Sequence, residues 1–377
     1  MSDRVVVAGG GPVGLAVALG LARRARLPVC VVERSAVPQW TPVDAYDARV
    51  YALSPASLDL LTALGVELDT SRMAPVHAMQ VWGDRTDAPL TLQRGMPLAA
   101  IVEHGALMQA LHAAAAGAIE IRHGQEIRRR SSGAVELSQG DVLDAGLLVA
   151  AEGRDSPLRE AAGIAVDRVD YRAMGVVANF ACEAAHGDIA RQWFRGDSVL
   201  ALLPLPGRRV SMVWSMPNAA AHAVDGLSPE ELAGRVRDAC HGALGSMQAL
   251  TPPVAFPLAR VTAQHWVQPG FVLAGDAAHT VHPLAGQGVN LGFGDAAALA
   301  DILGHRSRFS GIGDLAVLRR YARQRREAAW LVGELTDRLQ RLFIAPGESE
   351  AWWRNRGLGW LDRMPRAKSA LIAAAVR

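Results

Sequence analysis

The hydrophobic pattern near the N-terminus predicts a strand, a helix and a second strand in close succession. The run Val5 to Ala8 is apolar throughout, which is typical of a buried strand, and a helix-like run follows from Leu15 to Arg24. A second apolar run, Val29 to Val32, ends at Glu33. Because the stretch Gly9 to Gly14 connects the first strand to the helix, the order of these segments predicts a βαβ unit.

The chain continues to alternate helices and strands up to about residue 166. Ser54 is a predicted N-cap for a helix that begins with Pro55, and a second helix is predicted from Glu103 to Ala116. Further strands are predicted at Ala78 to Gly83, Ile119 to Arg122 and Gly146 to Ala151.

The pattern changes between about Asp167 and Leu258, where short β-type runs are separated by turn signals such as Pro206-Gly207. The sequence Ser228 to Glu231 has the form of a capping box and predicts one helix within this region. The predicted strands are Gly175 to Cys182, Ala190 to Phe194, Val199 to Leu205 and Val210 to Met216. We therefore expect a mostly antiparallel sheet that forms a second layer or domain.

A second junction of strand, glycine-rich turn and helix lies near the C-terminus. The apolar run Phe271 to Ala274 predicts a strand, and an Ala/Leu-rich helix is predicted from Ala296 to Leu303. A further helix is predicted from Asp314 to Phe343. The tail, Trp352 to Arg377, mixes tryptophans with arginines, so it can dock on the protein itself, on a partner or on a membrane surface.

Composition narrows the possible functions. The net charge of the 377 residues is +2 with acids and bases mixed, which excludes the basic stripe of a nucleic-acid-binding protein. The three cysteines are far apart, so we expect no metal site and no disulfide framework. No apolar run approaches the ~18 to 20 residues that span a bilayer. No signal peptide is visible before the first strand, and we expect a cytoplasmic protein, with a peripheral contact at the inner membrane left open.

The first glycine-rich turn has the form G-x-G-x-x-G in its required strand–helix context. Gly9 allows the tight turn, Gly11 lets the backbone approach a pyrophosphate, and Gly14 lets helix and strand pack closely. Glu33 is placed to accept hydrogen bonds from a ribose and disfavours a 2′-phosphate, which predicts FAD or NAD rather than NADP. Pro12 and Val13 of the turn, and Arg34 beside Glu33, complete the predicted cofactor-binding residues of this region.

The second turn carries an acid and exposes a helix N-terminus. Asp276 follows the strand directly, and Gly286-Gln287-Gly288 opens the next helix, where free N–H groups suit an anionic or electron-rich ligand edge. The alternative is a plain strand–loop–helix junction with a helix-capping Asp276. Arg49 is similarly open: it contacts a cofactor phosphate or the flavin edge, or it is a surface arginine beside Asp47.

These sites together resemble the FAD-dependent aromatic hydroxylases (flavoprotein monooxygenases), and among them the ubiquinone-biosynthesis hydroxylase group. The matching residues are Gly9 to Gly14 with Glu33, then Glu152-Gly153-x-x-Ser156-x-x-Arg159, and then Gly275-Asp276 with His282 to Gly292. Glu152 replaces the usual Asp of the second motif. Its extra methylene is either absorbed by the backbone or weakens the use of a pyridine nucleotide.

The resemblance implies roles for the residues of the second turn. Asp276 would hydrogen-bond the ribityl chain of FAD, and Arg49 would contact the cofactor. Backbone N–H groups near Gly288, Val289 and Asn290 would face the pyrimidine end of the flavin, where they would stabilise negative charge on reduction. Gly286 and Gln287 would also bind the cofactor. His282 and Pro283 would lie against the flavin face, and His282 is the candidate for assisting the proton of a phenol. No catalytic side-chain triad is expected.

The resemblance also implies the reaction and the fold. Reduced FAD would react with O₂, and a flavin hydroperoxide would pass one oxygen atom to a hydrophobic phenolic substrate. NAD(P)H would bind transiently, or another protein would donate the electrons. The expected fold class is α/β (α+β overall), with C-terminal helices. A Rossmann-like FAD-binding domain with a parallel sheet spans residues 1–72, 98–166 and 262–345. The mostly antiparallel substrate domain spans 73–97 and 167–261, and a helical tail spans 346–377.

Two rival interpretations stay open. The first is another FAD-dependent oxidoreductase that acts on an apolar substrate; against a halogenase, Trp214 to Pro217 lacks the expected tryptophan pattern. The second is a non-catalytic protein that holds FAD within a quinone-biosynthesis complex.

Overall fold

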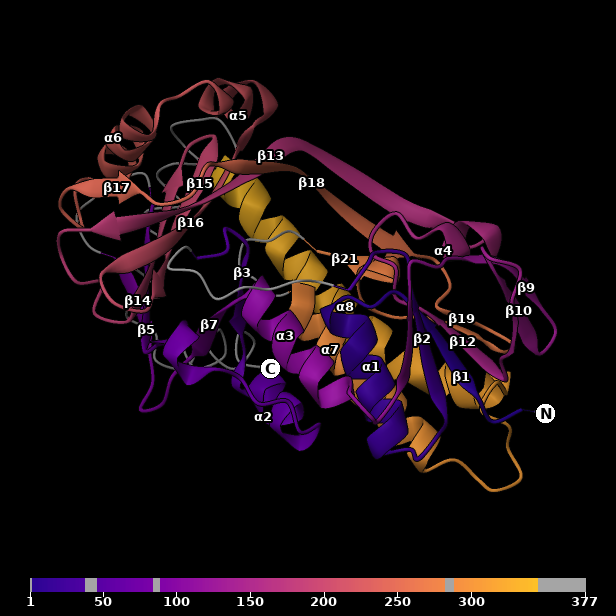
Figure 1. Cartoon of the computed structure of the whole chain (residues 1–377). Coiled ribbons are helices and arrows are strands. Elements are labelled where there is room, and N and C mark those ends of the chain that lie inside the picture. The colour runs from indigo at the N-terminus through magenta and orange to yellow at the C-terminus, as the bar shows by residue number, and fades with distance from the viewer. Residues whose placement is uncertain (1, 38–45, 84–88, 282–287, 345–377) are drawn as a thin grey trace.

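A parallel sheet organises the N-terminal and C-terminal parts of the chain. The computed structural model describes residues 2–37, 46–83, 89–281 and 288–344 (Figure 1). The sheet has six strands in the order β19-β20-β12-β1-β2-β8, all parallel except β19. Their bounds are β1 Val5–Ala8, β2 Val29–Glu33, β8 Glu120–His123, β12 Leu147–Ala150, β19 Val267–Gln268 and β20 Phe271–Leu273. β1, β12 and β20 are buried throughout, as expected where both faces of a parallel sheet are covered.

Helices from both ends of the chain pack together over this sheet. Helix α1 contacts α3 and α7, and α7 contacts α8 (Figure 1). The bounds are α1 Pro12–Arg23, α2 Pro55–Ala63, α3 His104–Ala115, α4 Pro157–Ala161, α7 Gly288–Gly304 and α8 Leu315–Ile344. Their apolar faces form one core with the strands. The tyrosine of α8, Tyr321, is fully buried and donates to the carbonyl of Leu273 at 2.9 Å, which fixes α8 to the end of β20.

Two predicted helix starts were wrong. Helix α1 begins at Pro12 rather than Leu15, because proline suits the first helical position. Helix α7 begins at Gly288, eight residues before the predicted Ala296. Gly292 and Gly294 of this helix have low helix propensity, but tight packing against other segments requires glycine at both positions. A Cβ at Gly292 would lie 2.3 Å from Val13, and one at Gly294 would lie 2.5 Å from Arg325.

The middle of the chain forms a nine-stranded, mostly antiparallel sheet, as predicted. Its strands follow the order β21-β18-β13-β16-β15-β14-β5-β6, with β17 paired to β13; only β14 and β5 are parallel. The bounds are β5 Ala78–Trp82, β6 Leu90–Gln93, β13 Val166–Cys182, β14 Ile189–Arg195, β15 Ser198–Leu205, β16 Arg209–Pro217, β17 Met247–Ala249, β18 Val254–Ala263 and β21 His279–Thr280. β13 begins nine residues before the predicted Gly175 because it pairs with the long β18 across a bulge.

One face of this large sheet is covered by two helices, α5 Asn218–Asp225 and α6 Pro229–Ala239 (Figure 1). Ser228 and Glu231 form the predicted capping box at the start of α6. Alternate residues of β13, among them Val176, Ala178 and Phe180, pack with these helices in a second core. The opposite face of the sheet therefore lies on the side of the parallel sheet.

Two smaller sheets complete the described residues. One has the order β3-β7-β4, with β3 Val50–Leu53, β4 Met73–Val76 and β7 Ala99–Glu103; the other has the order β11-β10-β9, with β9 Ile127–Ser131, β10 Ala134–Leu137 and β11 Val142–Asp144. Short 3₁₀ turns lie at Thr70–Arg72 and Gly275–Ala277. The predicted fold class is confirmed. The domain division stays a prediction, and β4 pairs with β7 across one of its boundaries.

The contact between α1 and α7 can be tested with a pair of helical glycines. Gly292→Ala should lower the free energy of unfolding. The ~1 kcal/mol gained from helix propensity is outweighed by overpacking against Val13, which costs about 1–3 kcal/mol or more. A Cβ at Gly234 of α6 meets no atom within 4 Å, so Gly234→Ala should raise stability by about 0.5–1 kcal/mol. Urea denaturation measures both; the same sign for the two variants contradicts the packing argument.

Candidate functional site

The first glycine-rich turn lies side by side with Gly275 and with the first turns of α7. A Cβ added at Gly275 would lie 3.0 Å from Cγ1 of Val13, and one added at Gly292 would lie 2.3 Å from Cγ2 of the same residue. Val13 belongs to the first turn of α1, Gly275 follows β20, and Gly292 lies in α7. The start of α1, the end of β20 and the first turns of α7 therefore form one site at the carboxyl ends of the parallel strands, where such sheets bind ligands.

The glycines of the first turn take the geometry that their roles require. Gly9 has φ +101°, and a Cβ there would lie 2.4 Å from the carbonyl oxygen of Ala151. A Cβ at Gly14 would lie 1.9 Å from the carbonyl oxygen of Gly9. By contrast, a Cβ at Gly11 meets no atom within 4 Å. The backbone at Gly11, which is also the N-cap of α1, is therefore open to a ligand.

Glu33 ends β2 beside this turn, as predicted. Its carboxylate accepts hydrogen bonds from the backbone N–H groups of Gly10 at 2.6 Å and Ser35 at 2.8 Å. Burial acts to raise the pKa of the Glu33 carboxyl, but these donated hydrogen bonds lower it by more, so it stays ionised. Arg34 is exposed, and its charge acts on both Glu33 and Glu152.

Asp276 lies in the 3₁₀ turn after β20. A Cβ at Gly288 would lie 4.0 Å from Oδ1 of Asp276, which places this acid at the start of α7. No hydrogen bond within the described residues occupies its carboxylate. The side chain is exposed, yet the surrounding protein removes enough water to raise its pKa above the ordinary value, against the effect of nearby positive charges.

Arg49 is one of those positive charges. It is exposed, and its backbone N–H donates to Oδ1 of Asp47 at 2.9 Å. Its guanidinium lowers the pKa of Asp276 and also acts on Tyr51 and His104, so it lies on the same side as the glycine turns. A cofactor contact for Arg49 remains a prediction, and its position is compatible with one.

The first residues of α7 are positioned by the side chain of Asn290. Its Oδ1 accepts from the N–H of Ser54 at 3.0 Å and from Oγ of Ser57 at 2.7 Å, and its Nδ2 donates to the carbonyl of Ala52 at 2.8 Å. This side chain therefore ties α7 to the start of α2. Val289 packs against the main core. Of the predicted site residues, His282, Pro283, Gly286 and Gln287 lie outside the described residues.

A buried cluster of charges, not anticipated from the sequence, lies under the Gly275 turn. Asp295 is fully buried, and its Oδ2 accepts from Nε2 of His279 at 2.6 Å and from the N–H of Gly275 at 2.9 Å. Its Oδ1 accepts from Nε of Arg325 at 2.8 Å, and Arg325 also donates to the carbonyl of Leu291. Burial acts to raise the pKa of Asp295, but His279 and Arg325 lower it by more. The ionised carboxylate thus joins β20, α7 and α8.

The second motif of the resemblance supports the same turn from another side. Arg159, at the start of α4, is buried and donates to the carbonyl of Ala277 at 2.9 Å. Glu152 accepts from Oγ of Ser156 at 2.6 Å and from the N–H of Leu158 at 3.2 Å, so its carboxylate turns back onto α4. Burial raises the pKa of Glu152. The effect of its extra methylene on the use of a pyridine nucleotide stays a prediction.

These residues fit an FAD molecule. The open backbone at Gly11 and the N-terminus of α1 suit a pyrophosphate, while the carboxylates of Glu33 and Asp276 suit ribose and ribityl hydroxyls. The N-terminus of α7 suits an electron-rich edge. Within the described ranges, no group of His, Cys, Asp or Glu side chains could hold a metal ion.

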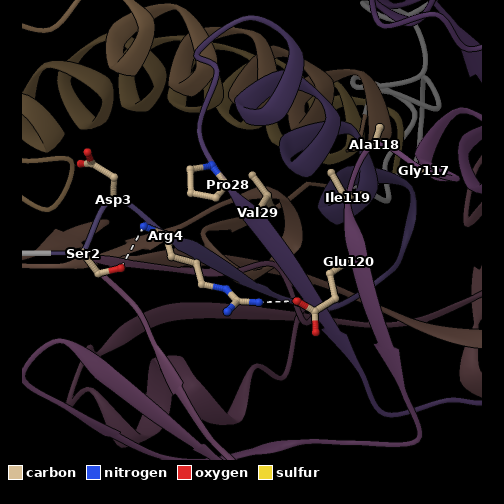
Figure 2. A pocket seen from close by; sticks show the side chains of 9 residues that line it. All are labelled: Ser2, Asp3, Arg4, Pro28, Val29, Gly117, Ala118, Ile119 and Glu120. Carbon is tan, nitrogen blue, oxygen red and sulfur yellow. Dashed lines mark hydrogen bonds and ion pairs between the residues drawn. The ribbon is translucent and has the colours of Figure 1, made fainter.

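A separate hollow of about 530 Å³ lies at the other end of the strands of the parallel sheet. Figure 2 shows its lining, which includes Arg4 paired with Glu120, and Pro28 and Val29 at the start of β2. It therefore lies at the amino ends of the strands, whereas the glycine turns lie at their carboxyl ends. It plays no part in the site described here.

Comparison with known proteins agrees with this geometry. Residues 3–336 match the family model described as an FAD binding domain. The chain is 34% identical over 337 residues to the 3-demethoxyubiquinol 3-hydroxylase of Escherichia coli, covering 85% of each. It is 30% identical to the ubiquinone hydroxylase UbiL of Rhodospirillum rubrum, covering 99% of this chain and 89% of that one.

Solved structures show the same fold. PqsL of Pseudomonas aeruginosa, a probable FAD-dependent monooxygenase, superposes with a TM-score of 0.78 at 22% identity, covering 95% of this chain and all of that one. The chain belongs to the FAD-binding flavoprotein monooxygenases and, within them, to the group of the ubiquinone-biosynthesis hydroxylases. The predicted resemblance is confirmed, and the protein is an FAD-dependent monooxygenase.

The buried charges under Gly275 predict a large effect of removing one partner. Arg325→Met should lower the free energy of unfolding by about 3–5 kcal/mol, because the fully buried Asp295 carboxylate loses a hydrogen-bonded counter-charge. Arg320→Met, at an exposed position of the same helix, should change it by about 0.5 kcal/mol at most. Denaturant titration measures both; equal, small effects contradict a structural role for the pair.

Proposed function

We propose that this protein hydroxylates the aromatic ring of a polyprenylated phenol or benzoquinol on the way to ubiquinone, with FAD as cofactor and O₂ as co-substrate. The observation that carries the proposal is the meeting of the Gly9 to Gly14 turn, Asp276 and the start of α7 at one place. The relatives named as ubiquinone hydroxylases supply the substrate class.

The chain's own residues bind and orient the cofactor in this proposal. The pyrophosphate lies against Gly11 and the N-terminus of α1, and Glu33 binds the ribose. Asp276 accepts from the ribityl chain, and N–H groups from Gly288 to Asn290 donate to the pyrimidine end, aided by the α7 dipole. When bound, FAD supplies the activation of O₂ that no side chain can supply.

The face of the large sheet opposite α5 and α6 supports an aromatic substrate. Val177, Val213 and Ala201 are small apolar neighbours in register across β13, β16 and β15. On the same face, Asn179 pairs with Ser211, and Nδ2 of Asn179 donates to the carbonyl of Asp47 at 2.9 Å. This face therefore lies toward Asp47 and Arg49, next to the proposed cofactor.

Two polar atoms on that face have no partner. Oδ1 of Asn179 and Oγ of Ser211 are buried without a hydrogen bond among the described residues. An unsatisfied buried polar group costs roughly 1–3 kcal/mol. Both atoms are closed off from solvent, so a substrate hydroxyl does not reach them in this structure. We infer that the ring lies between this face and the flavin, over the half-buried Ala201 and Val213.

The proposal also covers the electron donor, the protein partners and the location in the cell. NAD(P)H binds transiently, or a protein partner donates the electrons, and other quinone-biosynthesis proteins form a complex with this one. No helix within the described residues is long and apolar enough to cross a bilayer. A polyprenylated substrate resides in the membrane, so we propose a cytoplasmic protein that contacts the inner membrane peripherally.

The role of Asp276 is tested by FAD binding. Asp276→Ala should weaken FAD affinity about 10- to 100-fold, because a hydrogen bond to a charged group contributes roughly 1.5–3 kcal/mol. The large sheet should stay folded by circular dichroism. Asp301→Ala, an exposed aspartate of α7, is the control and should bind FAD normally. Wild-type FAD occupancy in the Asp276 variant would show that the ribityl contact is placed wrongly.

The reaction itself is tested with purified, FAD-loaded protein. NAD(P)H or a protein donor should bleach the yellow flavin, faster when a polyprenylphenol is present. The product should gain one oxygen atom derived from ¹⁸O₂, as read by mass spectrometry. In a deletion strain, the accumulating quinone intermediate should lack the hydroxyl that this protein adds. Flavin that no donor bleaches, together with unchanged quinone intermediates, would support the non-catalytic FAD-holding alternative instead.

A further inference from the structure

A cationic groove of about 620 Å³ lies beside α8, away from the glycine turns. One wall is formed by Arg319, Arg323 and Arg326 of α8, and the other by the segment His265 to Pro269. The ring of Trp266 stacks on His279 at 5.0 Å between centroids, so this tryptophan separates the groove from the Asp295 cluster. The groove is therefore distinct from the cofactor site.

The three arginines belong to one stripe along the helix. Positions 319, 323, 326 and 330 are spaced by four, three and four residues, which places them on one face of an α-helix. The fourth position is Trp330, with 64% of its surface exposed, and Leu331 beside it is 58% exposed. At 1.5 Å per residue the stripe is about 17 Å long. We call Arg319, Arg323, Arg326 and Trp330 the α8 stripe.

The arginines of the stripe have no counter-charge among the residues that the structure describes. Within the described ranges, no hydrogen bond or ion pair reaches Arg319, Arg323 or Arg326, and all three are exposed. Arg325 of the same helix is the contrast, because it turns inward to Asp295. The indole N–H of Trp266, which lines the groove, is buried and also lacks a partner. The groove thus carries positive charge, and no acidic side chain is among its lining residues.

We propose that the α8 stripe docks the protein on anionic phospholipid headgroups. The arginines bind the phosphates, while Trp330 and Leu331 enter the boundary between headgroups and acyl chains. A single free phosphate is too small to contact the whole stripe, which is about 17 Å long. It also has no apolar part that could contact Trp330 and Leu331. A lipid surface offers both chemistries side by side.

The docking surface deepens the proposed function, on which it rests for the source of the substrate. Helix α8 contacts β19 of the parallel sheet and β14 of the large sheet (Figure 1). Docking through α8 would therefore hold both sheets at the membrane, and with them the face opposite α5 and α6 that receives the ring. A polyprenyl tail could stay in the bilayer while the ring is bound.

Vesicle binding tests the proposal without any turnover. The full-length, FAD-loaded protein should co-sediment with vesicles that contain phosphatidylglycerol and bind pure phosphatidylcholine vesicles only weakly. Each membrane-facing arginine contributes about fivefold to partitioning, so the triple variant Arg319→Ala, Arg323→Ala, Arg326→Ala should bind roughly 100-fold more weakly. Binding by the wild type should fall as salt shortens the Debye length.

The matched control removes three exposed arginines elsewhere. Arg24→Ala, Arg128→Ala, Arg235→Ala changes the net charge equally and should keep most of the vesicle binding. Trp330→Ala alone should also weaken vesicle binding relative to the wild type. This loss should persist at high salt, because the apolar contribution of Trp330 does not depend on charge. Both triple variants should keep FAD and be reduced as the wild type is, which separates this proposal from the proposed function.

Three results would overturn the docking proposal. The first is an equal loss of binding in the two triple variants. The second is release by inorganic phosphate at an ionic strength where chloride has no effect, which would assign the groove to a free phosphate. The third is wild-type protein that binds no anionic vesicle. Intact vesicle binding without hydroxylation would overturn the proposed function alone.

Discussion

The close approach of α1 and α7 is the constraint on which the rest of the site depends. Val13 packs where Gly275 and Gly292 have no side chains, at distances that leave no room for a Cβ on α7. Further along the same pair of helices, a Cβ at Gly20 would lie 3.1 Å from that of Ala300. Two turns more than 260 residues apart in sequence are thereby held against each other, so that a single nucleotide can contact both.

The hydrogen bonds and ion pairs of Asp295 depend on the packing of α1 against α7, and they stabilise the same arrangement. A fully buried carboxylate is stable only with partners, and Asp295 has three: a backbone N–H, an imidazole and a guanidinium. Each partner comes from a different part of the site, namely the turn after β20, β21 and α8. Loss of the α1–α7 contact would move these groups apart and leave the charge unpaired. The Gly275–Asp276 turn is thus fixed from below by charge, and by Arg159 from the side.

The parts of the structure that were predictable from sequence are those governed by neighbouring residues. The strand, glycine turn, helix and acid from Val5 to Glu33 follow from local sterics, and the structure reproduces them. The Ser228 capping box is similarly local. The start of α7 was mispredicted because Gly292 and Gly294 lower helix propensity, while their reason for being glycine lies in distant side chains, Val13 and Arg325.

The charge cluster was beyond local reasoning for the same reason. Asp295 sits among small residues of a helix, a position that signals burial, but nothing nearby in sequence names its partners. Arg325 is one of many arginines in α8, and only the fold distinguishes it from Arg323 or Arg326. The roles of Asn290 and Arg159 were equally hidden, because their side chains bond to backbone groups of distant segments, Ala52 and Ala277.

Helix α8 shows how one element serves opposite physical demands on its two sides. Its inner side is apolar apart from Tyr321 and Arg325, and each of these has a hydrogen-bond partner that the burial requires. Its outer side carries exposed arginines that no acid among the described residues neutralises. A buried arginine without Asp295 would lower the stability of the fold, because its charge would be unpaired. An exposed arginine that already had an acidic partner would be less able to bind an external anion. Arginine therefore stabilises the Gly275–Asp276 turn on one side of α8 and provides charge for an external anion on the other.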